Sequence, residues 1–125
     1  MTAAALLAKL PDTIRVGPYD FALVRLAMNE AMAKPRLGEF SSRAHRIEIV
    51  ADAPSKLDAL DTLLHEILHA IYWSSQIYDE DKEERIVGMM ATAWVQVYRD
   101  NPWLIGWIGE AVDRHPIMAE AGDAR

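Results

Sequence analysis

Two histidines and a glutamate stand at a spacing that can bind and use a metal ion. Residues 65 to 69 read His65-Glu66-Ile67-Leu68-His69, which is the pattern H-E-x-x-H. In a helix, side chains four residues apart lie on one face, so both imidazoles can reach one ion. Glu66 follows His65 by about 100° around the helix, where it can accept a proton from a water held by that ion. The pattern predicts His65 and His69 as metal ligands and Glu66 as a catalytic base.

The segment around this motif has the periodicity of an amphipathic helix. Ser55 is followed three positions later by Asp58, which resembles a capping box. Leucines and isoleucines then recur at helical spacing, so we predict a helix from Lys56 to Ser75. The two histidines fall at the edge of its apolar stripe, which places them against the protein and open to water.

A catalytic zinc ion usually has three protein ligands and a water, so a third ligand must come from elsewhere. His45 and His115 are the other histidines. The simpler interpretation is a surface position at a strand end for His45 and a cation at a helix C-terminus for His115. His45, just before a predicted strand, could instead stabilise an oxyanion at a strand edge near the active-site helix. The acidic run at residues 79–84 supplies carboxylates where a second helix begins. The same run also suits a solvated helix N-terminus, because negative side chains are favoured there.

The rest of the chain predicts a small sheet followed by helices, and thus an α+β fold. Strand patterns occur at residues 13–17 and 46–50. Residues 21–28 are too densely apolar for periodicity to separate a strand from a helix, and the turn before them favours a strand in a hairpin. Residues 29–43 are predicted to be a connection. Further helices are predicted at residues 2–10, 82–98 and 103–113, and the tail after about residue 118 is predicted to fray. We therefore expect about three strands packed on the H-E-x-x-H helix, with the second helix beside it.

Aromatic and apolar residues in the last two predicted helices allow more than one interpretation. The second helix is predicted to bury one face, formed by Ile86, Val87, Met90, Trp94 and Val97. The last helix carries Trp103, Ile105 and Trp107 on more than one side. Core packing is the default for these residues, and a dimer face or a substrate-binding patch is the alternative.

Length and composition limit the classes of protein that need to be considered. The 125 residues, with 51% hydrophobic content, suit a single domain over residues 1–125. The net charge of −6, without a basic cluster, argues against nucleic acid as a ligand. The absence of cysteine excludes disulfides and thiolate metal sites and fits a cytoplasmic protein. Neither a membrane span nor a signal peptide is expected.

One family has the same motif in a similar setting. From Thr62 the chain reads TLLHEILHAIY and then DEDKEERIVGMMATAWVQVYRDNP. This resembles the small phage-type zincin-like metallopeptidases, which share their layout with the ImmA/IrrE metallopeptidases. The segment Gly38-Glu39-Phe40 also resembles the phage-type pattern, so the resemblance covers roughly residues 13 to 102. It implies a minimal zincin-like fold, in which the helix after the H-E-x-x-H helix carries a zinc-binding glutamate in its first turn.

The resemblance also selects among the acidic residues. In the ImmA/IrrE type the zinc-binding glutamate precedes a small or apolar residue by three, which Glu84 does with Val87. Glu83 precedes Ile86 in the same way and is the alternate. Gly88 departs from the family, which usually has asparagine at that position.

The activity that the resemblance implies is zinc-dependent hydrolysis of a peptide bond. His65, His69 and Glu84 would hold one Zn²⁺ per chain, and Glu66 would activate the attacking water. The substrate would be a protein or peptide, and family analogy suggests a regulatory protein such as a repressor. One alternative is a non-catalytic zinc-binding interaction module of phage or prophage origin. Another is a metal-free assembly protein built on a helical hairpin.

Overall fold

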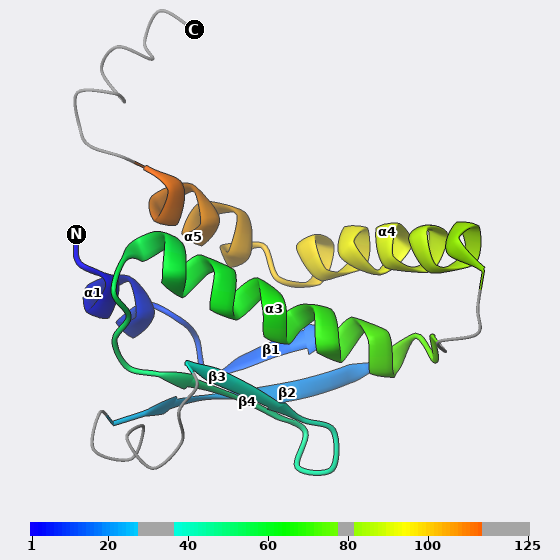
Figure 1. Cartoon of the computed structure of the whole chain (residues 1–125), viewed down its shortest axis with the longest axis horizontal. Helices are drawn as coiled ribbons and strands as arrows, with labels where there is room; N and C mark the ends of the chain where they lie inside the picture. The colour runs from blue at the N-terminus through cyan, green and yellow to red at the C-terminus, as the bar shows by residue number, and fades with distance from the viewer. Residues whose placement is uncertain (28–36, 78–81, 114–125) are drawn as a thin grey trace, which may run out of the picture.

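A four-stranded mixed sheet forms one layer of the fold, and the helices lie on one side of it (Figure 1). The computed structural model describes residues 1–27, 37–77 and 82–113. The strands are β1 (Thr13–Val16), β2 (Tyr19–Leu26), β3 (Gly38–Ser41) and β4 (Arg46–Val50). Their order across the sheet is β1-β2-β4-β3. β2 and β4 run parallel, and the two outer pairs are antiparallel.

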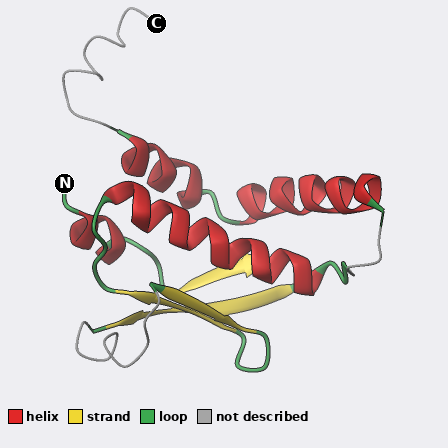
Figure 2. Ribbon diagram, viewed as in Figure 1, coloured by secondary structure: helices red, strands yellow, loops and turns green. Residues whose placement is uncertain are grey.

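Four helices are present in the described ranges. They are α1 (Ala3–Ala8), α3 (Lys56–Ser74), α4 (Glu83–Asp100) and α5 (Trp103–Val112). The longest, α3, lies across the sheet (Figure 2). α5 contacts α3, and α4 contacts both α3 and the edge strand β1. The fold is therefore α+β, as the sequence predicts, and α3 has the predicted start and ends within one residue of the prediction.

The core lies between the sheet and α3. Alternation along β1 and β2 turns Ile14, Val16 and Phe21 toward the helix, and all three are buried. The helix buries Leu63 and Ile67 against them at helical spacing. Burial of each such side chain contributes about 1.5–3 kcal/mol to the free energy of folding. The positions of these residues therefore determine which face of α3 packs on the sheet.

The prediction of three strands is wrong, because the sheet has four. The additional strand is β3, which lies in the segment predicted to be a connection. Its four residues are too short to show periodicity, and pairing with β4 stabilises it. This pairing places β3 at the edge of the sheet, beside α3.

The buried face of α4 also differs from the prediction. Ala93 and Val97 are the buried residues of this helix, whereas Val87 is 55% exposed and Trp94 is partly buried. Because both buried residues lie in its C-terminal half, α4 is packed mainly at that end. Residues 86–98 contain apolar side chains on every side, so periodicity alone does not select the buried face.

The aromatic α5 belongs to the core. Trp107 is 4% exposed, and its indole N–H donates a hydrogen bond of 2.8 Å to the carbonyl oxygen of Leu6. Trp103 is partly buried against the same core. The default interpretation of these tryptophans is therefore confirmed, and Ile105 is the large apolar residue that α5 leaves most exposed.

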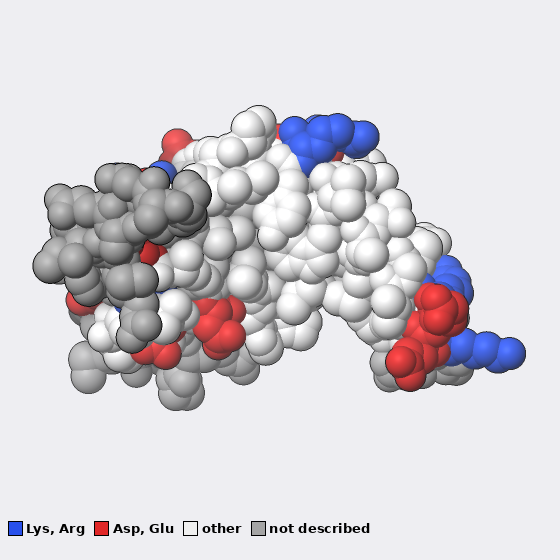
Figure 3. All heavy atoms as spheres, turned by 90° about the horizontal axis from the view of Figure 1, so that it is seen from above, with Lys and Arg blue, Asp and Glu red and all other residues white. Residues whose placement is uncertain are grey.

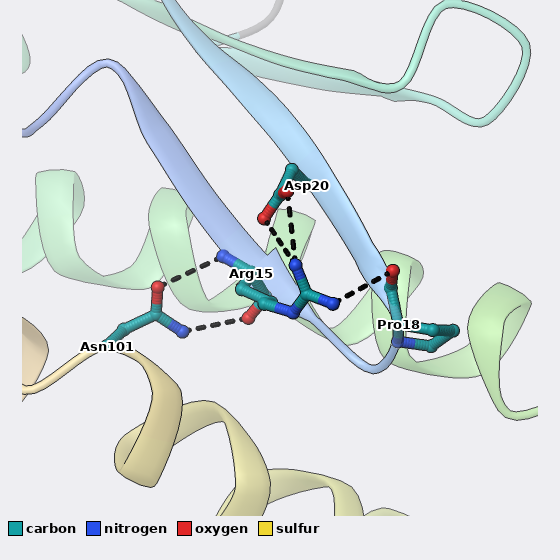
Figure 4. Close-up of polar contacts among 4 residues, drawn as sticks. All are labelled: Arg15, Pro18, Asp20 and Asn101. Carbon is teal, nitrogen blue, oxygen red and sulfur yellow. Dashed lines mark hydrogen bonds and ion pairs between the residues drawn. The ribbon is translucent and has the colours of Figure 1, made fainter.

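A buried asparagine joins the corner between α4 and α5 to the sheet (Figure 4). The side-chain oxygen of Asn101 accepts from the backbone N–H of Arg15 at 3.0 Å. Its amide nitrogen donates to the carbonyl oxygens of Arg15 and Val97, both at 2.8 Å. Because β1 is an edge strand, this amide satisfies backbone groups on an edge of the sheet. The C-terminal end of α4 is thereby anchored to the sheet.

Some sequence predictions fall outside the described residues. They concern His115, the tail after residue 118 and the first part of the acidic run, residues 79–81. Within the described ranges, none of the helices has the combined length and apolar character needed to cross a membrane.

Candidate metal centre

The H-E-x-x-H motif lies in the middle of α3, on a helix with a well-formed start. The hydroxyl oxygen of Ser55 accepts from the backbone N–H of Asp58 at 3.1 Å and donates to its carboxylate at 2.8 Å. This is the predicted N-cap, and it satisfies one of the free N–H groups of the first turn. The cap and the buried apolar stripe together fix both the start of the helix and its rotation on the sheet.

The side chains of His65 and His69 face each other through their Nε2 atoms. Their Nε2 atoms are 3.2 Å apart, the ring centroids are separated by 4.8 Å, and both residues are exposed. Two histidines bound through Nε2 to one tetrahedral zinc, at about 2.0–2.1 Å each, have these atoms about 3.3 Å apart. The observed separation therefore fits a shared metal ion.

Glu66 lies in the wall of a cleft between α3 and the edge strand β3. The cleft has a volume of about 490 Å³, and the histidines lie along it. It is lined by Leu37, Gly38, Glu39, Phe40, Asp61, Thr62, His65, Glu66 and His69. Glu66 is 6% exposed, so its carboxyl group is withdrawn from bulk water beside the two imidazoles. A partly desolvated carboxylate next to a metal position is suited to proton transfer.

Gly38 allows β3 to approach α3 closely at this point. A Cβ atom at residue 38 would lie 2.8 Å from Cγ2 of Thr62, 3.1 Å from the carbonyl oxygen of Glu48 and 3.3 Å from Cγ of Glu66. All three contacts are shorter than ordinary van der Waals contact, and one of them is to backbone. A side chain here would therefore push the strand away from the helix.

We expect Gly38→Ala to lower the free energy of unfolding by about 1–3 kcal/mol, the usual cost of overpacking. Chemical denaturation measures this change. Gly106→Ala in α5 is the matched control, because a Cβ there meets nothing within 4 Å and alanine favours a helix. If Gly38→Ala were as stable as Gly106→Ala, the close approach of β3 would not be required.

The predicted third ligand is not beside the histidines. Glu83 and Glu84 are exposed in the first turn of α4. Within residues 1–27, 37–77 and 82–113, no three His, Cys, Asp or Glu side chains form a group that could hold a metal. The structure thus brings together His65, Glu66 and His69 but not the acidic residue, and the choice between Glu84 and Glu83 stays a prediction.

A second hollow lies on the other side of the histidine pair. It has a volume of about 320 Å³ and is lined by His65, Leu68, His69, Tyr72 and Met90. Met90 belongs to α4, so this hollow separates the N-terminal half of α4 from the motif. The two histidines are accordingly open both to the cleft and to the helix that carries the predicted glutamate.

His45 has a different environment from the one required for oxyanion stabilisation. It stands in the turn between β3 and β4 with a φ of 49°, and its ring lies 5.3 Å from that of Tyr19 and 5.6 Å from that of Trp73. It is not among the residues that line the cleft. The strand that follows it, β4, lies between β2 and β3, so the strand edge beside the motif belongs to β3.

The comparisons with known proteins do not identify a relative. No family model, no curated protein and no solved structure matches this chain. The function must therefore be inferred from the site itself.

The site contains residues that sequence analysis did not assign to it. Gly38 and Phe40 line the cleft from β3, within the segment predicted to be a connection. Asp61 and Thr62 line it from α3, one turn before the motif. The helical periodicity places the second pair on the same face as His65, but the first pair depends on strand pairing that is not visible in the sequence.

Proposed function

We propose that this protein is a zinc-dependent peptidase. The observation that carries the proposal is the convergence of two Nε2 atoms, 3.2 Å apart, beside a buried glutamate in an open cleft. Histidine and carboxylate donors suit zinc better than magnesium or calcium. The volume of the cleft is within the range typical of ligand sites.

Each residue of the site has a distinct role in this proposal. His65 and His69 would hold the ion, with Glu84 as the predicted third ligand and Glu83 as its alternate. When bound, zinc would polarise the scissile carbonyl and lower the pKa of water in its open position. Glu66 would accept the proton of the attacking water and then donate it to the leaving amine.

The edge of the sheet supports a peptide as substrate. β3 is the last strand of the sheet, and the structure describes no strand beyond it. An extended peptide can add to the edge strand of a sheet through main-chain hydrogen bonds. Because β3 also lines the cleft, such a peptide would pass in front of the histidines. The family resemblance adds a regulatory protein as the substrate, and the cysteine-free composition favours a cytoplasmic location.

Metal analysis tests the proposal directly. We expect close to one zinc per chain when the protein is purified without an affinity tag or a chelator. Zinc should be lost in His65→Ala, which removes a ligand, and retained in His45→Asn. Asparagine tolerates the positive φ of residue 45, and that residue lies outside the cleft. The absence of zinc from the wild type, even after incubation with the ion, would contradict the proposal.

Zinc should also stabilise the folded chain. At a free concentration of 100 times Kd, binding to the native state alone raises the free energy of unfolding by about 2.7 kcal/mol. Thermal unfolding with and without zinc measures this shift, which we expect in the wild type and in His45→Asn but not in His65→Ala. An equal shift in His65→Ala would place the ion elsewhere. If zinc raised the stability to a plateau but no peptide were hydrolysed, the result would instead support the non-catalytic zinc-binding module.

A further inference from the structure

The outer face of α4 is apolar and exposed to solvent. Val87 and Val95 are 55% and 66% exposed, and Tyr98 is 37% exposed. Residues 86–98 contain no charged side chain. Seen from above, charged side chains lie at the far right, at the upper edge and at the left beside the grey residues, and a broad area between them is uncharged (Figure 3). An exposed helix face of this kind is typical of a contact surface.

Four residues on this face form a continuous seam. Gly88, Ala91, Val95 and Tyr98 follow one another at intervals of three, four and three residues, which places them along one side of the helix. All four are exposed. A Cβ added at Gly88 would meet no atom of the described residues within 4 Å, so none of these residues occupies the space directly in front of it. We refer to these four residues as the α4 seam.

We propose that the α4 seam binds a second copy of this chain, with the two α4 helices antiparallel about a two-fold axis level with residue 93. In this register Gly88 faces Tyr98 of the other copy, and Ala91 faces Val95. Each small residue thus faces a larger one, so the seam is complementary to itself in shape. A parallel arrangement would place Tyr98 against Tyr98 and Gly88 against Gly88, which leaves a clash at one end and a gap at the other.

The charges at the two ends of α4 favour the same arrangement. The first turn carries Glu83, Glu84 and Arg85, and the last turn carries Arg99, which pairs with Asp100 at 3.3 Å. Antiparallel helices bring the first turn of one copy near Arg99 of the other, and they also align the helix dipoles favourably. Glu84, four residues before Gly88, lies on the same side of the helix as the seam and can contact Arg99 of the other copy, whereas Glu83 lies about 100° away around the helix. The buried Trp107 makes the aromatic α5 a weaker candidate for a dimer face.

Sedimentation velocity tests for the dimer. We expect the wild type to sediment as a dimer at about 0.1 mM, a concentration well above a dimer Kd of micromolar order. Val95→Glu should give a monomer, because it places two charges together at the centre of the seam. Leu57→Glu is the matched control: Leu57 is 62% exposed in α3, so this variant should remain a dimer. A monomeric wild type, or a dimeric Val95→Glu, would overturn the proposal.

Cross-linking tests the orientation, and the absence of native cysteine makes it specific. Gly88→Cys and Tyr98→Cys are mixed, equilibrated and oxidised. The mixture should form a disulfide-linked dimer, since these positions face each other. Each variant alone should not, because its two cysteines would lie about 15 Å apart along the helix axis, beyond the reach of a disulfide. Equally efficient cross-linking of Gly88→Cys alone would show parallel pairing, and no cross-link in the mixture would exclude the proposed register.

Discussion

Replacement of Glu66 by glutamine is expected to leave zinc bound and to reduce peptide hydrolysis by about 10²- to 10⁴-fold, the usual contribution of a general base. Glutamine has nearly the shape of glutamate, so the packing of residue 66 against Gly38 is retained. Its amide cannot accept the proton of the attacking water. Because Glu66 is 6% exposed beside the histidine pair, bulk water has poor access to replace it as a base.

Three measurements separate this effect from a general loss of structure. Zinc content and the zinc-induced rise in stability should equal those of the wild type, whereas the rate of peptide hydrolysis should fall. Glu110→Gln makes the same chemical change in α5, where Glu110 pairs with Lys9 at the surface, and should leave the rate unchanged. Wild-type activity in Glu66→Gln would exclude Glu66 as the base. Loss of zinc from that variant would instead make Glu66 part of the metal site.

The motif and its helix could be predicted because the signals that define them are local. Ser55 begins α3, and the apolar stripe that follows fixes which side faces the sheet. The spacing of His65 and His69 then places both rings on one exposed face, as the structure shows. Each of these signals operates within a few residues along the chain, so no tertiary information was needed.

The rest of the site depends on contacts between distant segments. Residues 38–41 become a strand by pairing with β4, and only then does Gly38 reach α3. The rotation of α4 depends on tertiary contacts because its sequence is apolar on all sides. The choice of third ligand also depends on this rotation, because Glu83 and Glu84 point in directions about 100° apart around the helix.

Asn101 joins the end of α4 to β1, and we expect Asn101→Leu to lower the free energy of unfolding by about 2–4 kcal/mol. Leucine has the same branching of side-chain heavy atoms but cannot form the three hydrogen bonds to the backbone of Arg15 and Val97. Arg15 would then have a backbone N–H and a carbonyl oxygen unsatisfied beside a buried side chain. Urea denaturation measures the change.

The control for this prediction separates the backbone of Arg15 from its side chain. Arg15→Ala removes the exposed ion pair with Asp20 but keeps the backbone groups that Asn101 binds, so it should cost less than about 1 kcal/mol. Asn101→Leu should also weaken zinc binding in the proposed peptidase, because α4 carries the predicted third ligand and is anchored at this end. A cost for Asn101→Leu no larger than that for Arg15→Ala would show that packing of Ala93 and Val97, and not the buried amide, holds α4 on the sheet.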